Sequence, residues 1–314
     1  MERDGTSKAM KKAIKKIWLT AGIMLLAATI ARADEVEQAL SDIAPQGVVE
    51  STRELIESGL ASERAIAVTR AMLQNRFEAP QIAEVHRVLL KAQNQGLPPG
   101  PIIDKALEGM AKHVRADRIV RAMDAVRSRH DFSLRQARKL TARKSQQVQM
   151  GHVIAAGLTA GLTPQSVESI TAGLLERSRT MKTHQRDLLA LETFKMARDM
   201  ARLGVTPTQT AAVVCQALQH QFSARQMQNM RTAFRDDSRT TAPQSLAASY
   251  GRSIQQGKSF GSPVGSQMGE GHGAGSTGGA GSGPGGSGPG GGGPGGGGSG
   301  GGGPGGGGPG GSGG

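Results

Sequence analysis

The sequence is poor in aromatic residues and in cysteine. Aromatic side chains make up 3% of the 314 residues, with one tryptophan and one tyrosine, and Cys215 is the single cysteine. One cysteine cannot form an internal disulfide, which excludes a small disulfide-stapled fold. Few aromatic side chains leave little surface for stacking on bases, which argues against a nucleic-acid-binding protein. Stability must therefore come from packed aliphatic faces.

Catalytic and metal-binding motifs are also lacking. No two of the seven histidines stand four residues apart around a glutamate, as in a zinc-binding helix, and there is no G-x-S-x-G turn. The carboxylates are scattered, so general acid-base catalysis has no candidate pair. We therefore expect no enzyme activity, no cofactor and no metal site, although catalytic groups can also be assembled in space from distant positions.

Long apolar runs are missing too, except for one stretch near the N-terminus. Four lysines lie between positions 11 and 16, residues 17–30 are uncharged and mostly apolar, and Ala31, Arg32 and Ala33 precede Asp34. This order is typical of a secretory signal cleaved after Ala33. The alternative is a retained anchor, but fourteen helical residues span only about 21 Å of a hydrocarbon layer roughly 30 Å thick. The sequence predicts export, to the periplasm or outside the cell.

Apolar and charged residues both disappear toward the C-terminus. Of the 47 glycines, 33 lie in residues 261–314, which contain one acidic residue and no lysine or arginine. Such a segment has nothing to bury and should stay disordered as a linker or tether. We expect a signal peptide at 1–33, an acidic helical lead-in at 34–58, a helical-hairpin domain at 59–237, and a disordered linker with a low-complexity tail at 238–314.

The middle of the chain has a helical period. Apolar residues recur three and four positions apart, as in Ile119, Met123 and Val126, and this spacing favours helices over strands. We predict an all-α fold of tandem αα-hairpin repeats, arranged as a solenoid or as an irregular helical bundle.

Ten-residue phrases recur within this region. "MLQNRFEAPQ" at 72–81 resembles "ALQHQFSARQ" at 217–226, and an offset of 145 aligns both phrases together with a glycine 18 positions before each phenylalanine. A glycine ends a helix in the left-handed conformation, and a Ser or Thr followed three positions later by Gln caps the next helix. The phrase is therefore interpreted as a helix-to-helix corner. The predicted corner residues are Gly59, Phe77, Gly96, Phe132, Ser133, Gly161, Thr163, Gly204, Thr206, Phe222, Ser223 and Gln226.

One region departs from the repeat. The 65 residues between Gly96 and Gly161 exceed the usual unit of about 37 to 43, so we expect an extra or longer helix that begins near Leu134.

The same region concentrates positive charge. The formal net charge is +13, and residues 1–33 contribute seven basic and two acidic side chains, so +8 remains without them. Ten basic residues lie within 30 positions: Arg115, Arg118, Arg121, Arg127, Arg129, Arg135, Arg138, Lys139, Arg143 and Lys144. A solvated helix face is the simpler interpretation, and a surface for an anionic partner is the functional one.

These observations predict an exported, non-enzymatic helical-repeat protein that acts as a binding or scaffold module of the cell envelope. Its partner would be an anionic polymer, a lipid headgroup or an acidic protein surface, bound through the arginine-rich stretch. A protein-protein adaptor that uses an apolar groove, and an envelope enzyme, remain as alternatives.

Overall fold

A computed structural model describes residues 35–258 and 260, and all of its secondary structure is helical. The predicted signal peptide with Ala31, Ala33 and Asp34, and the glycine-rich segment 261–314, lie outside the described residues. After a short helical segment at 35–40, eleven helices follow within the described part of the chain. They are α2 (Gln46–Glu57), α3 (Ser62–Gln74), α4 (Ala79–Asn94), α5 (Gly100–Ala111), α6 (Ala116–Leu140), α7 (Lys144–Thr159), α8 (Pro164–Arg177), α9 (Thr183–Arg202), α10 (Pro207–Gln219), α11 (Ala224–Asp237) and α12 (Pro243–Gln255).

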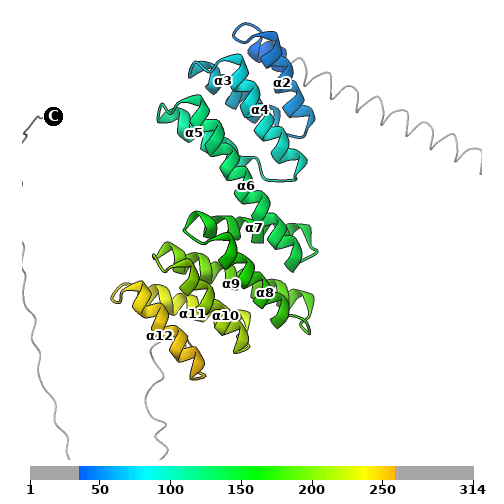
Figure 1. The fold of residues 1–314 in the computed structure, drawn as a ribbon. Helices are drawn as coiled ribbons and strands as arrows, with labels where there is room; N and C mark the ends of the chain where they lie inside the picture. The colour runs from blue at the N-terminus through cyan, green and yellow to red at the C-terminus, as the bar shows by residue number, and fades with distance from the viewer. Residues whose placement is uncertain (1–34, 259, 261–314) are drawn as a thin grey trace, which may run out of the picture. The chain divides into compact units, whose positions relative to one another are not determined.

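Alternate helices pack side by side in two layers (Figure 1). In the first half α2 packs on α4 and α4 on α6, while α3 packs on α5. In the second half α7, α9 and α11 form one row and α8, α10 and α12 form the other. This arrangement is the tandem helical-hairpin architecture that the 3.6-residue period predicts.

The corners have the geometry expected of glycine-terminated helices. Gly59, Gly96, Gly161 and Gly204 all have positive φ, between 69° and 117°. At each corner the residue after the glycine is apolar, and its N–H donates to the backbone carbonyl oxygen five positions back. The bond from Val205 to the Met200 oxygen, at 3.0 Å, is an example. This is the Schellman motif, which satisfies carbonyls that the helix end would leave free.

The capping boxes are confirmed at two corners and half-formed at a third. The Thr163 and Ser223 hydroxyls each accept from the N–H three positions on, and the side chains of Ser166 and Gln226 accept from the cap N–H in return. Thr206 accepts from the Gln209 N–H at 3.4 Å, but the Gln209 side chain donates to the Gln244 oxygen instead. The expected Thr206–Gln209 box is therefore only half right.

The predicted corner at Phe132 and Ser133 is wrong. Both residues lie inside α6, which runs unbroken for 25 residues from Ala116 and does not begin near Leu134. Ser133 is buried, and its hydroxyl donates to the backbone oxygen of Arg129, four positions back in the same helix, at 2.8 Å. The hydroxyl therefore bonds within α6 and does not cap a new helix. An ion pair between Asp131 and Arg135 spans the same turn and supports its helical continuity.

Helix α6 joins two clusters of buried apolar residues. The N-terminal core runs from Val36 to Leu134 and includes the first half of α6, which packs on α4 and α5. The C-terminal core runs from Ala137 to Ile254 and includes the end of α6, which packs on α7 and α8. The region that breaks the sequence repeat is therefore the element shared by both cores.

The structured array extends beyond residue 237, where the sequence suggested a linker. Helix α12 packs on α10 and buries Leu246, Tyr250 and Ile254. The Tyr250 ring stacks on Phe260 with centroids 4.4 Å apart, and its hydroxyl donates to Asp237 at 2.8 Å. These contacts cover the C-terminal core at its last helix pair, so the domain boundary at 237 was placed too early.

Candidate anion-binding surface

The arginine-rich stretch does not form one face. Arg115 lies at the N-cap of α6 and Lys139 in its last turn. A helix of 25 residues is roughly 37 Å long, so the two ends of the stretch lie far apart. The structure therefore divides the ten predicted residues into an N-terminal group, a middle and a C-terminal group.

Half of these ten side chains already have carboxylate partners. Arg127 shows how complete the pairing can be: its side chain is 7% exposed, and it donates to Asp124 at 2.7 Å and to Gln95 at 2.8 Å. Such a buried guanidinium belongs to the packing of α6 against the α4–α5 corner. The five ion-paired residues are Arg115 and Arg121 with Asp117, Arg127 with Asp124, Arg135 with Asp131, and Arg143 with Asp187.

The remaining five side chains have no carboxylate partner but differ in whether they make a hydrogen bond. Arg129 donates to the Thr159 hydroxyl at 3.1 Å, and Arg138 approaches the Gln95 oxygen at 3.5 Å. The side chains of Arg118, Lys139 and Lys144 are exposed and make no hydrogen bond or ion pair with any described residue. Two of these three free cations lie at the C-terminal end of the stretch.

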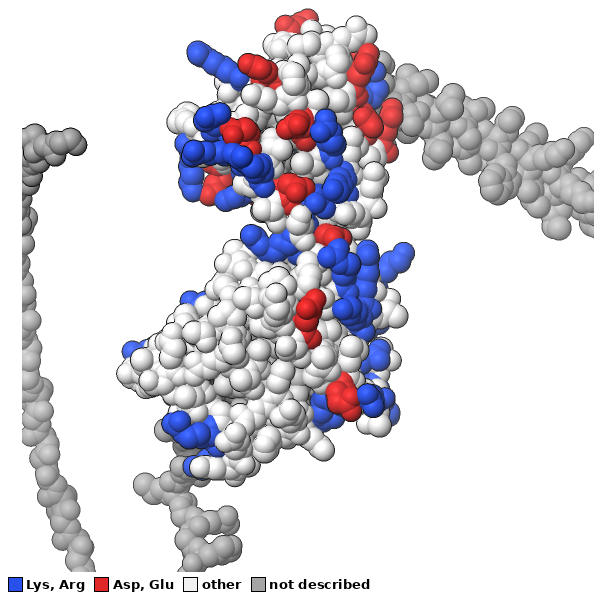
Figure 2. Space-filling view, in the orientation of Figure 1, with Lys and Arg blue, Asp and Glu red and all other residues white. Residues whose placement is uncertain are grey.

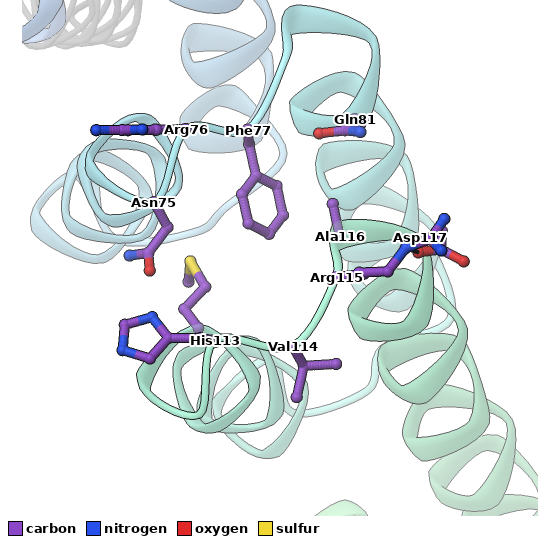
Figure 3. Close-up of a pocket in the computed structure, with 10 residues that line it drawn as sticks. Asn75, Arg76, Phe77, Gln81, His113, Val114, Arg115, Ala116 and Asp117 are labelled. Atoms are coloured by element: carbon purple, nitrogen blue, oxygen red, sulfur yellow. Dashed lines mark ion pairs between the residues drawn. The ribbon is translucent and has the colours of Figure 1, made fainter.

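At the N-terminal end, the stretch borders a hollow of about 400 Å³ between the α3–α4 and α5–α6 corners. The Phe77 ring points into the space between the corners, with Val114 opposite (Figure 3). Arg76 and His113 lie on one side, both with positive φ, and Arg115 and Asp117 on the other. The Asp117 carboxylate pairs with both Arg115 and Arg121, whereas the exposed Arg76 has no ion-pair partner among the described residues. The hollow therefore has a rim that keeps positive charge around Phe77 and Val114.

At the C-terminal end, the stretch continues into a second corner. Arg143, between α6 and α7, donates from Nε to the Asp187 carboxylate of α9 at 2.8 Å. Arg177, at the end of α8, donates to the Gln221 oxygen of the α10–α11 corner at 3.2 Å. These bonds place the α6–α7, α8–α9 and α10–α11 corners next to one another along one side of the helical array.

We call residues 135–144 and 176–187 the basic edge. Its nine basic residues face two acidic ones, Glu176 and Asp187, which gives a net charge of +7. The corners at the other ends of these helices, residues 158–165, 202–208 and 235–243, hold three basic and two acidic residues. The basic residues of the edge are Arg135, Arg138, Lys139, Arg143, Lys144, Arg177, Arg179, Lys182 and Arg186.

Lys and Arg side chains gather where Figure 1 shows the α6–α7 and α8–α9 corners, beside a broad surface of the C-terminal helices without charge (Figure 2). The Lys182 side chain is exposed and, like those of Lys139 and Lys144, makes no hydrogen bond or ion pair among the described residues. Cations near helix C-termini are favoured by the helix dipole, which accounts for Arg138, Lys139 and Arg177. It does not account for Lys144 and Lys182, which stand at helix N-termini, where a cation is disfavoured.

The α8–α9 part of this surface was missed in the sequence. Its signal was available in "RSRTMKTHQRD" at 177–187, where four basic residues occur within ten positions. The spacing of 33 residues or more from the α6 cluster concealed the relation, because only the packing of the hairpins brings the two corners together.

One serine and one histidine lie in contact within the N-terminal core. The Ser51 hydroxyl is 2.8 Å from His86 Nδ1, and the Thr69 hydroxyl is 3.0 Å from His86 Nε2. His86 is 1% exposed, and burial lowers its pKa to about 4. A catalytic histidine would need access to substrate, so this chain of hydroxyls around a neutral imidazole serves the packing of α2, α3 and α4.

Two other histidines meet across α6 and α7. The rings of His130 and His152 have centroids 5.7 Å apart, and burial, with smaller contributions from His152 and Arg129, lowers the pKa of His130 to about 4. No sequence pattern predicts this contact between His130 and His152. Within residues 35–258 and 260, no three or more His, Cys, Asp or Glu side chains are placed to hold a metal ion.

Comparison with known proteins adds no family to this picture: no protein-family model and no curated protein matches the sequence. Among the described helices, none is both long and apolar enough to cross a membrane.

Proposed function

We propose that this protein is an exported, non-enzymatic helical-repeat module that binds an anionic partner of the cell envelope through its basic edge. The observation that carries the proposal is the gathering of Lys139, Lys144 and Lys182 at adjacent corners, exposed and without a carboxylate partner in the described structure. Lysines kept at helix N-termini without compensation oppose stability. A bound anion would relieve this cost.

Export rests on the N-terminal segment, whose cationic, apolar and small-residue order is that of a secretory signal. The two-layered array suits a scaffold, because the packing of successive hairpins brings the side chains of adjacent corners together on one surface.

The experiment uses two variants of the full chain that lose the same charge. One replaces Lys139, Lys144 and Lys182 with Gln, and the control replaces Arg64, Lys91 and Arg118, which are equally exposed and unpaired within the described residues but lie elsewhere. Binding to immobilised inorganic polyphosphate is measured along a salt series. We expect the edge variant to bind more weakly, with the slope of log affinity against log salt reduced by about 2, and the control to keep most of the wild-type slope.

Equal losses in both variants would mean that net charge alone drives binding. Binding of wild-type chain that survives high salt would instead favour the adaptor alternative, for which the hollow lined by Phe77, Met110 and Val114 is the specific candidate.

A further inference from the structure

The basic edge carries apolar side chains as well as positive charge. Five large hydrophobic side chains are strongly exposed within the described residues, and three of them, Val148, Leu175 and Leu188, lie beside the basic corners. Val148 stands in the second turn of α7, Leu175 in the last turn of α8 and Leu188 in the second turn of α9. Their exposed fractions are 45%, 41% and 43%.

Exposed apolar side chains beside unpaired cations favour one class of anionic partner over the others. A soluble polyanion is neutralised by cations alone and gains nothing from leucine. A membrane with anionic headgroups offers both phosphates for lysine and arginine and an apolar layer for side chains that reach past them. Apolar residues exposed beside free lysines therefore fit a lipid surface better than a charged polymer.

The arrangement of the α8–α9 corner supports this fit. Arg179 and Lys182 stand in the five-residue connection between the two helices, with Leu175 before it and Leu188 after it on the neighbouring helices. A helical residue advances about 1.5 Å along the axis, so both leucines lie within roughly 8 Å of the helix ends. Both leucines therefore lie close enough to Arg179 and Lys182 to enter the headgroup region together with these cations.

We propose that the basic edge docks on an anionic lipid surface, with the α8–α9 corner inserted among the headgroups. This inference rests on the proposed function and specifies its partner. The two acids of the edge do not oppose it, because Asp187 is buried against Arg143 and Glu176 pairs with Arg179 at 2.6 Å.

The test is co-sedimentation of the chain as exported, residues 34–314, with vesicles of phosphatidylcholine alone and of phosphatidylcholine mixed with phosphatidylglycerol; omitting residues 1–33 removes the lysines and the apolar run of the predicted signal. The wild-type chain should bind only the anionic vesicles. Each lysine near an anionic surface contributes roughly fivefold, so replacing Lys139, Lys144 and Lys182 with Gln should lower binding about a hundredfold.

A second variant separates membrane docking from simple charge attraction. Replacing Leu175 and Leu188 with Gln keeps every charge, and because both side chains are already exposed the fold should stay intact, as circular dichroism can verify. We expect this variant to lose about tenfold in vesicle binding and nothing in polyphosphate binding.

Each outcome bears on one of the two proposals. Wild-type chain that binds polyphosphate but not anionic vesicles overturns the membrane inference and leaves the proposed function standing. Failure to bind either ligand overturns both. Unchanged vesicle binding after loss of the two leucines overturns insertion of the α8–α9 corner.

Discussion

At the scale of single residues, the buried His86 has the clearest consequence. It lies between Ser51 and Thr69, and Thr69 is 3.2 Å from Thr52, which donates to the Val48 oxygen at 2.7 Å. With the Nε2–H tautomer, each donor in this series of hydrogen bonds has one acceptor: Ser51 donates to Nδ1, Nε2 donates to Thr69, Thr69 donates to Thr52, and Thr52 donates to the Val48 oxygen. In a protonated imidazole Nδ1–H would donate to the Ser51 oxygen, and the Ser51 hydroxyl could donate to the Val48 oxygen at 3.1 Å, so the cost of protonation is the charge buried in the N-terminal core.

This arrangement predicts that acid destabilises the protein. The pKa of His86 falls from 6.5 to about 4 on folding, so the unfolded chain binds the proton more tightly. The contribution of neutral His86 is therefore complete above pH 6.5 and is lost as the pH falls toward 4, with a total on the order of 3 kcal/mol. Urea denaturation of the wild-type chain and of His86→Gln over this range measures it. Similar pH dependence in both proteins would show that other groups are responsible.

Residue identity also explains which corners could be predicted. A glycine marks four of the corners in the sequence, because a φ such as +105° at Gly59 is strained for any other residue. Arg76, His113 and Gln221 adopt the same left-handed conformation without being glycine. No sequence pattern marks them individually, and only the alignment of repeats suggests their positions.

At the scale of elements, the sequence predicted an extra or longer helix between Gly96 and Gly161 but placed its beginning near Leu134, whereas α6 begins at Ala116. "FSLRQA" at 132–137 matches "FSARQM" at 222–227, yet only the second forms a corner. The local pattern is the same in both, so the tertiary setting decides: α6 is buried on α4 and α5 before this point and on α7 after it. Propensity and capping signals yield to such packing.

The two matching phrases allow a direct test of this difference. Pro80 already occupies the second position of α4, which corresponds to Arg225 in α11 and to Arg135 in α6. Both arginines are exposed. We expect Arg225→Pro to be tolerated in a first helical turn, and Arg135→Pro to cost about 3 kcal/mol or more in a helix interior. Thermal unfolding of the two variants gives the comparison, and equal losses would contradict a continuous α6.

The last helix, α12, was missed for a different reason. Leu246, Tyr250 and Ile254 recur at a spacing of four, which is a helical pattern. The pattern is short, is flanked by polar residues and precedes the glycine-rich segment, so composition favoured a linker. Its stability comes from contacts with α10 and from the aromatic cluster around Tyr250, which only the folded array provides.

At the scale of the whole molecule, the sequence located the excess of positive charge but did not show which cations are exposed and unpaired. Counting arginines could not tell that Arg127 is buried or that Arg143 neutralises Asp187, because both facts depend on contacts 32 to 44 residues apart in the chain. Five of the ten predicted cations form ion pairs; four of these pairs join residues two to four positions apart in the α6 region, and the fifth, Arg143 with Asp187, depends on the packing of successive hairpins. This packing also adds the α8–α9 corner, which aligns with the end of α6 along one side of the described structure.

The central claim is that the basic edge, rather than the rest of the surface, meets the anionic partner. The most direct test replaces Cys215 with Ser and introduces one cysteine either at Thr180, in the α8–α9 corner, or at Thr240, in the α11–α12 corner; both positions are exposed. A fluorophore on each cysteine is quenched with acrylamide, with and without polyphosphate or phosphatidylglycerol vesicles. The account predicts protection at position 180 and none at position 240. Equal protection at both positions, or protection at 240 alone, would contradict it.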